Sequence, residues 1–172
     1  MTNCSDALSR AISRLRNNNG KLFFVLLVAV VAGTVIPRRV GIILTPSLSH
    51  RFFWVSRDPS HVGRGDYVFF VDPDLARKVG KSEHPNIFKI IRCDEGDTLT
   101  VDANREFFCN GEFLGTAKDY SLKGEKMQYF DFNGKIPKGL MFVMGEHKDS
   151  YDSRYFGLEE KSRVRAKLYP IL

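Results

Sequence analysis

Residues 145–157, Gly-Glu-His-Lys-Asp-Ser-Tyr-Asp-Ser-Arg-Tyr-Phe-Gly, form a polar segment that directly follows the apolar run Leu140–Met144. From Val40 onward the chain has a similar texture, with short β-branched and aromatic runs separated by Gly, Pro, Asn and Asp. Such runs are typical of strands and predict a mainly β domain. The expected strands are Val40–Leu44, Phe52–Ser56, Tyr67–Val71, Asn86–Arg92, Thr98–Asp102, Glu106–Cys109, Glu112–Leu114, Leu140–Met144 and Ser162–Tyr169. We also expect a hairpin turn at Asn110-Gly111 and a short helix or loop over Asp74–Val79.

One lysine lies inside an apolar strand, in Ile87-Phe88-Lys89-Ile90-Ile91. The alternation of a strand puts Lys89 on the same face as Ile87 and Ile91, where it has apolar neighbours. Burial lowers the pKa of a lysine from its ordinary value of about 10.4, and the neutral amine can then act as a general base. The alternative is an exposed edge strand, on which a lysine discourages aggregation. The pattern alone leaves both interpretations open.

Four further segments of the chain, taken in sequence order, bear on its function. Together with residues 145–157, they resemble the sequence blocks of the type I signal peptidase superfamily. They are 64–68 (Arg-Gly-Asp-Tyr-Val), 88–92 (Phe-Lys-Ile-Ile-Arg) with Gly96-Asp97, Asn110-Gly111, and 136–145 (Ile-Pro-Lys-Gly-Leu-Met-Phe-Val-Met-Gly). The resemblance covers about residues 40–169. It implies a signal-peptidase-like β-rich catalytic domain in which a serine is the nucleophile and Lys89 is the base.

Within the superfamily, the chain most resembles the conjugative-transfer (TraF-type) peptidases that mature pilins, which carry a Ser-x-Pro-x-Gly-x-Tyr pattern. The matching segment begins at Ser47, but Ser49 stands where Pro is expected and Arg51 where Gly is expected. These departures leave two registers for the nucleophile. Ser47 is favoured because an apolar residue follows it. Ser49 is the alternative because Pro46-Ser47-x-Ser49 is similar to the Pro-Ser-Gly-Ser of host leader peptidases.

The resemblance implies acyl transfer by a Ser47/Lys89 dyad. Ser47 would attack the peptide carbonyl while neutral Lys89 accepts its proton. The backbone N–H of Ser47 and the hydroxyl of Thr45 would stabilise the oxyanion.

By the same resemblance, Ser150 would orient Lys89, and Asp152 and Arg154 would form a supporting ion pair. No cofactor and no metal are expected, because the sequence has no zinc-ligand spacing and no phosphate-binding glycine loop.

The amino-terminal part carries a membrane signal. Residues 22–36 contain no charge, four basic residues precede them, and Arg38 and Arg39 follow. The positive-inside rule then predicts a cytoplasmic arm over residues 1–21, a transmembrane anchor over 22–36 and a periplasmic peptidase domain over 37–172. A cleaved signal peptide over 22–36 is the alternative. The expected location is the bacterial inner membrane, with a single pass.

These observations predict an endopeptidase that removes the leader or terminal segment of a conjugative pilin precursor. The alternatives are a general type I signal peptidase for secretory precursors and a non-catalytic tethered binding module of the same fold. The expected partners are a membrane-inserted prepilin or other exported precursor, the lipid bilayer and other conjugative transfer components. Nucleic acid is not expected, because residues 1–21 alone account for +3 of the net charge of +6.

Two cysteines, Cys93 and Cys109, fall in the expected exported domain. An oxidising compartment permits a disulfide between them. Two strand-end cysteines whose separation in space is unknown can equally stay as free thiols, so the sequence leaves both states open.

Overall fold

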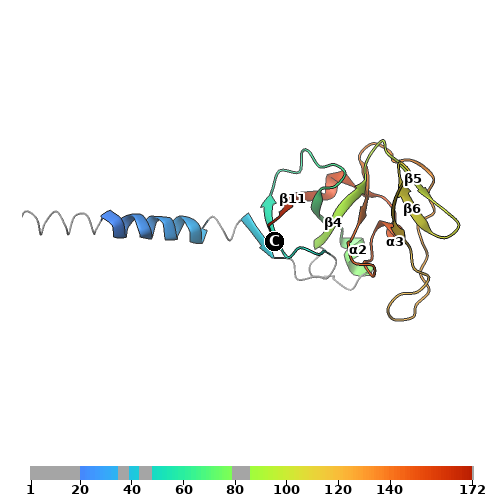
Figure 1. Ribbon diagram of the computed structural model, residues 1–172, viewed down its shortest axis with the longest axis horizontal. Coiled ribbons are helices and arrows are strands. Elements are labelled where there is room, and N and C mark those ends of the chain that lie inside the picture. The colour runs from blue at the N-terminus through green and yellow to red at the C-terminus, as the bar shows by residue number, and fades with distance from the viewer. Residues whose placement is uncertain (1–19, 35–38, 43–47, 79–85, 172) are drawn as a thin grey trace, which may run out of the picture. The chain divides into compact units, whose positions relative to one another are not determined.

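The computed structural model of the 172-residue chain describes residues 20–34, 39–42, 48–78 and 86–171. The chain divides into two compact units, Met1–Val40 and Gly41–Leu172. In the first unit, residues 20–34 are helical (Figure 1). The large apolar side chains of this helix are exposed. No helix within the described ranges has both the length and the apolar character needed to span a bilayer. The anchor expected over residues 22–36 stays a prediction.

The second unit is built on two sheets, and the larger one has seven strands. In spatial order these are β1 (Val40–Ile42), β2 (Phe52–Ser56), β11 (Val164–Pro170), β3 (Tyr67–Val71), β4 (Asn86–Cys93), β9 (Leu140–Met144) and β10 (Glu159–Glu160). The pairs from β2 to β10 are antiparallel. The last strand of the chain, β11, lies between two early strands, β2 and β3. β4 is an interior strand, flanked by β3 and β9.

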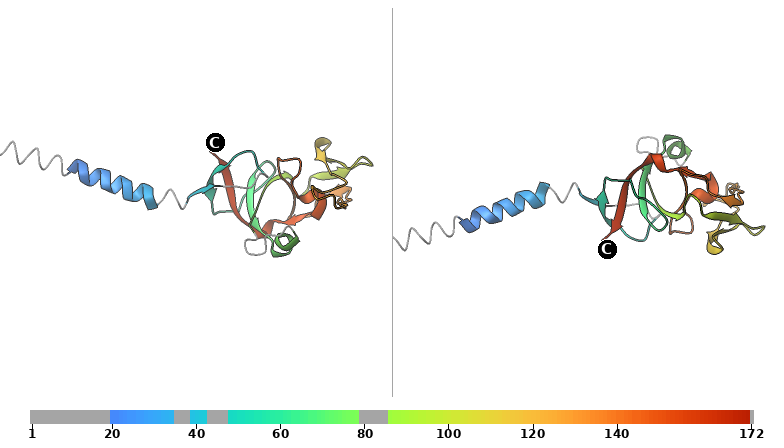
Figure 2. Two further views of the ribbon diagram at one scale, coloured as in Figure 1. Left: turned by 90° about the horizontal axis from the view of Figure 1, so that it is seen from below. Right: turned by 90° about the horizontal axis from the view of Figure 1, so that it is seen from above.

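The smaller sheet has four antiparallel strands in the order β7 (Glu112–Thr116), β6 (Glu106–Cys109), β5 (Thr98–Val101) and β8 (Gly134–Lys135). It lies at the end of the domain opposite β11, as Figures 1 and 2 show. The expected hairpin is confirmed. Asn110 and Gly111 have φ of 51° and 82°, the positive values that a type I′ turn requires at both central positions.

The mainly β prediction is confirmed, with differences in the short elements. A helix α2 (Pro73–Lys78) occupies the stretch left open as helix or loop, and residues 79–85 lie outside the described residues. Residues 162 and 163 belong to a 3₁₀ turn, Lys161–Arg163, so β11 begins later than expected. The sequence did not predict β8, β10 or the four-residue helix α3 (Ser153–Phe156). The strand expected over Val40–Leu44 is described only to Ile42.

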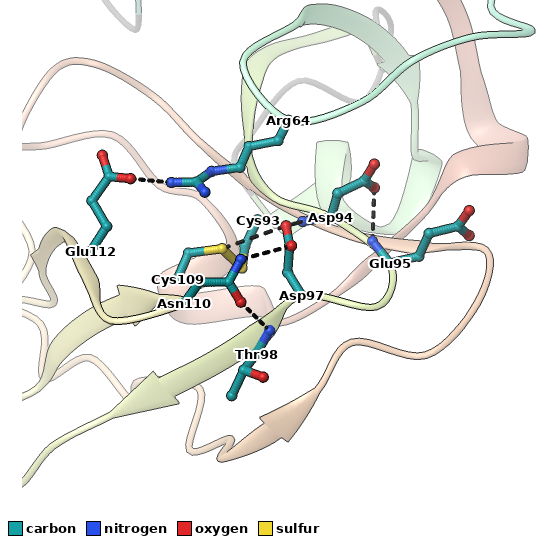
Figure 3. Close-up of a disulfide and its surroundings, with 9 residues drawn as sticks. All are labelled: Arg64, Cys93, Asp94, Glu95, Asp97, Thr98, Cys109, Asn110 and Glu112. Carbon is teal, nitrogen blue, oxygen red and sulfur yellow. Dashed lines mark hydrogen bonds and ion pairs between the residues drawn. A yellow bond between two sulfur atoms is a disulfide. The ribbon is translucent and has the colours of Figure 1, made fainter.

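A disulfide joins the two sheets. Cys93 at the end of β4 is bonded to Cys109 at the end of β6, with their Cα atoms 5.6 Å apart (Figure 3). Both residues are fully buried in a cluster that also contains the stacked rings of Phe107 and Phe142. The paired state left open by the sequence is therefore the one observed. The bond holds the smaller sheet against the strand that carries Lys89.

Candidate active site

Lys89 lies in the middle of β4, opposite Val68 of β3. Its side chain is 4% exposed, and its Nζ donates a hydrogen bond to Ser150 Oγ at 2.6 Å. The neighbours on its face, Ile87 and Ile91, are buried. The exposed-edge interpretation of Lys89 is therefore wrong. Burial among apolar side chains disfavours the charged ammonium and favours the neutral amine that a general base needs.

Ser150 is held by a polar network within residues 145–157. Asp152 accepts hydrogen bonds from Arg154 Nε at 2.8 Å and Nη2 at 2.9 Å, and from the backbone N–H of Gly145 at 3.0 Å. Arg154 in turn donates to the carbonyl of Ser150 at 3.3 Å. The ion pair expected between Asp152 and Arg154 is thus present, and both side chains are buried.

Asp152 keeps the side chain of Arg154 charged. Burial by itself would lower the pKa of Arg154, but the hydrogen bonds and negative charge of Asp152 outweigh burial and raise it. Arg154 therefore stays charged and binds the loop that presents Ser150 through the carbonyl of that residue. Neither Arg154 nor Asp152 takes part in the hydrogen bond between Lys89 and Ser150.

Glu146 forms a second polar cluster, which the sequence analysis missed. Its Oε2 accepts from both the backbone N–H and the hydroxyl of Ser49, each at 2.6 Å, and its Oε1 accepts from Tyr67 Oη at 3.0 Å. His50 Nδ1 lies 3.2 Å from Ser49 Oγ. Burial would raise the pKa of Glu146, but the hydrogen bonds from Ser49 and Tyr67 outweigh it and lower the pKa. The hydroxyl of Ser49 is thus engaged with a carboxylate.

Ser47 and Thr45, the expected nucleophile and oxyanion group, lie outside the described residues. The next residue, Leu48, is buried in a cluster with Phe53, Leu168 and Ile90. Since Ile90 is adjacent to Lys89 in β4, this cluster brings the chain beside Ser47 to the strand of the buried lysine.

A three-residue group in the described part has the spacing of a metal site. The ligand atoms of Cys93, Asp97 and Cys109 lie within 4.8 Å of one another. Both sulfurs are consumed by the disulfide, so neither is a thiolate that could bind a metal (Figure 3).

A buried lysine amine that is hydrogen-bonded to a serine hydroxyl is the kind of group that Ser–Lys peptidases use as their base. The family described as "Signal peptidase, peptidase S26" matches residues 18–171. The chain therefore belongs to this family and is a serine-type signal peptidase.

Among solved structures, the chain is similar to a signal peptidase I from Enterococcus faecalis V583. The two are 24% identical, and the match covers 64% of this chain and 98% of the other, with a TM-score of 0.41. No curated protein matches the chain.

Proposed function

We propose that the protein is a membrane-anchored endopeptidase that cleaves the leader or terminal segment of a conjugative pilin precursor with a Ser47/Lys89 dyad. The observation that carries the dyad is the burial of Lys89 on an interior strand, with its amine hydrogen-bonded to Ser150. The pilin as substrate rests on the TraF-type resemblance of the segment that begins at Ser47.

The reaction is acyl transfer. Ser47 Oγ attacks the carbonyl carbon of the scissile bond, and Lys89 Nζ takes the hydroxyl proton. The backbone N–H of Ser47 and the hydroxyl of Thr45 donate to the oxyanion. As the C–N bond breaks, Lys89 returns the proton to the leaving amine. The acyl-enzyme then reacts with water, or with the substrate's own amino terminus, which would yield a circular pilin.

Ser150 acts as a positioning residue for Lys89. A flexible lysine side chain samples many rotamers, and a hydrogen bond from a buried serine restricts its amine to one place. Asp152 and Arg154 fix the loop that carries Ser150, so they support the site without contacting the reacting atoms.

The contacts of Ser49 favour Ser47 as the nucleophile. A nucleophilic hydroxyl must give its proton to the base, whereas Ser49 Oγ donates to Glu146 at 2.6 Å. Glu146 and Ser49 instead tie the polar loop after β9 to the segment that follows Ser47. We infer that Ser49 holds this segment in place.

The proposed location is the inner membrane, with residues 1–21 in the cytoplasm, residues 22–36 as the anchor and residues 37–172 in the periplasm. Basic residues before the apolar run and the Cys93–Cys109 disulfide support this orientation, because disulfides persist in oxidising compartments. An anchored enzyme also meets a membrane-inserted precursor at high effective concentration.

The test is co-expression of a conjugative prepilin with wild type, Ser47→Ala, Lys89→Ala and, as the matched control, Ser49→Ala. Mass spectrometry of the pilin gives the cut position and separates hydrolysis from cyclisation. We expect mature pilin with wild type, slower but detectable maturation with Ser49→Ala, and precursor alone with the other two variants. Normal maturation by Ser47→Ala and Lys89→Ala would show a non-catalytic module or a different dyad. Equal processing of ordinary secretory precursors by wild type would favour a general signal peptidase.

A further inference from the structure

A cleft of about 1010 Å³ opens beside the proposed active site. Its lining comes from three parts of the chain: Arg77 and Lys78 at the end of α2, residues 118, 120–123 and 125–128 of one loop, and Asp149, Ser150, Tyr151 and Tyr155, which we call the floor. Ser150 belongs to this floor and is the residue that accepts the hydrogen bond from Lys89. The cleft therefore begins at the side chain that positions the proposed base.

The lining of the cleft is strongly basic. It contains five cationic residues, Arg77, Lys78, Lys118, Lys123 and Lys126, against two carboxylates, Glu125 and Asp149. Lys118 is paired with Asp149, and Arg77 is paired with Asp74. Across the described ranges, no carboxylate forms an ion pair with the other three lysines of the lining. The cleft thus carries positive charge that the domain itself does not neutralise.

The loop that carries two of these lysines is built as a fixed turn. Ser121 N donates to Glu125 O at 2.8 Å, Gly124 N to Ser121 O at 3.0 Å and Met127 N to Asp119 O at 2.7 Å. The loop is also attached to the floor, since Lys118 N donates to Tyr155 Oη at 3.0 Å. Because the backbone of the turn is hydrogen-bonded, the loop loses less conformational entropy than a free loop would when a ligand binds.

The floor also carries two aromatic rings. The rings of Tyr151 and Tyr155 stack with their centroids 5.5 Å apart, and both line the cleft. Stacked tyrosines can contact the apolar parts of a peptide, while lysines of the same cleft pair with carboxylates. This combination suits an acidic polypeptide segment better than a free small anion, which would not use the aromatic floor.

We propose that this cleft binds an acidic segment of the substrate polypeptide next to the scissile bond, and so selects substrates by charge. The proposal rests on the proposed function, because the cleft is linked to the Ser47/Lys89 dyad only through Ser150, which lines the cleft and binds Lys89. Charge complementarity of this kind mainly raises the rate of encounter and the affinity. We therefore expect an effect on KM and little effect on kcat.

Direct binding is tested with the full-length Ser47→Ala protein in detergent, so that no cleavage occurs. The probe is fluorescein-labelled hexaglutamate, followed by anisotropy at 50 mM and 500 mM salt. The variant is Lys123→Glu/Lys126→Glu, on the exposed turn. The matched control is Lys135→Glu/Lys138→Glu, which has the same charge change at two exposed lysines that do not line the cleft.

We expect the cleft variant to bind hexaglutamate at least tenfold more weakly than the parent at 50 mM salt, and the control to change affinity less than threefold. The difference should shrink at 500 mM, where charges are screened over about 4 Å. Equal losses in both variants, or no saturable binding, would overturn the proposal. Vesicles containing phosphatidylglycerol form a separate arm. Loss of vesicle binding without loss of hexaglutamate binding would assign the lysines to lipid, and would also overturn it.

Cleavage tests selection separately, with the dyad intact. Two versions of the prepilin are compared, one with Asp and Glu placed beside the cut and one with Asn and Gln at the same positions. The cleft variant should lower kcat/KM at least fivefold for the acidic version only, through KM. Equal effects on both versions contradict the proposal. If Ser47→Ala still matures pilin while the binding results are as expected, the proposed Ser47/Lys89 dyad is wrong, but the proposed binding of acidic segments in the cleft is supported.

Discussion

At the scale of single residues, the hydrogen bond between Lys89 and Ser150 is the sharpest test of the site. Ser150→Ala removes the hydroxyl that accepts from Lys89 Nζ and leaves a buried amine with one partner fewer. A hydrogen bond between neutral groups contributes about 0.5–1.5 kcal/mol, so we expect kcat to fall about 2–13-fold. Steady-state kinetics on the prepilin would measure this loss.

A merely structural role for Ser150 would give a different pattern. Ser150→Thr keeps the hydroxyl and should restore most of kcat, while the far-UV circular dichroism of both variants should match wild type. If Ser150→Ala and Ser150→Thr lose kcat equally, the hydroxyl is not the group that matters. A loss confined to KM would likewise place Ser150 in substrate binding.

The residues of the site differ in how far the sequence could predict them. The alternation of β4 gave Lys89 apolar neighbours but left open whether it is buried, and the family resemblance favoured the buried base that is observed. The bond to Ser150 was likewise implied by the resemblance. The contact between Glu146 and Ser49 spans 97 residues and depends on how two loops meet. No pattern of neighbouring residues in the sequence predicts a contact between loops so far apart in the chain. The one local signal was that Glu146 lies within residues 145–157, a segment that resembles a signal peptidase block.

At the scale of elements, the sequence predicted the strands whose own side chains specify them. β3, β4 and β9 are apolar runs, and many of their own side chains are buried. β8 and β10 are two-residue strands, Gly134-Lys135 and Glu159-Glu160, which exist because neighbouring strands offer them partners. Helix α3 did have a local signal, since Asp152 caps it and Gly157 ends it.

The edge strand β10 carries an acidic residue with an unusual environment. Glu159 is 3% exposed, and its Oε1 accepts from Arg163 Nη1 at 3.1 Å. Arg163 also bonds Asp72 at 2.8 Å. Burial, and then the negative charge of Asp72, raise the pKa of Glu159 to about 7, more than Arg163 lowers it.

A raised carboxyl pKa makes stability depend on pH in a defined direction. Between the ordinary value of 4.5 and about 7, the folded state holds a proton that the unfolded state releases. The contribution of Glu159 is therefore fully present below pH 4.5 and is lost as pH rises through 7, with a total of at most about 3 kcal/mol. Glu159→Gln removes this dependence.

Urea denaturation at pH 5 and pH 8 measures the change. We expect Glu159→Gln to gain stability over wild type at pH 8 and to differ less at pH 5. Glu160→Gln, at the exposed neighbouring position, is the matched control and should keep the pH dependence of wild type. An unchanged dependence in Glu159→Gln would assign the effect to other groups.

The loop before α3 depends on the buried ion pair of Asp152 and Arg154. Arg154→Met leaves the fully buried carboxylate of Asp152 without its charge partner, and breaking such a pair costs about 3–5 kcal/mol. Adding Asp152→Asn removes the uncompensated charge, so the double variant should lose less stability than Arg154→Met alone. Urea denaturation of both variants tests this, and a double variant that loses as much as the single one contradicts the role assigned to the pair.

At the scale of the whole molecule, the domain is built on two separate sheets, and Lys89 lies on the larger one. The disulfide joins them at the end of β4, four residues after Lys89. Next to it, Asn110 donates to Asp97 at 2.8 Å and accepts from Thr98 N at 2.8 Å (Figure 3). The sequence could not decide this pairing, since it follows from how β6 packs against β4.

The disulfide should therefore matter more for stability than for chemistry. It closes a loop with a sequence separation of 16, for which loss of the crosslink costs about 3 kcal/mol. We expect Cys93→Ser/Cys109→Ser to lower the urea midpoint accordingly, while kcat on the prepilin at 25 °C changes less than threefold. Wild type treated with reductant should match the double variant, and the variant itself should not respond to reductant. A large loss of kcat in a variant that stays folded would mean that the joined sheets also hold Lys89 in its reactive position.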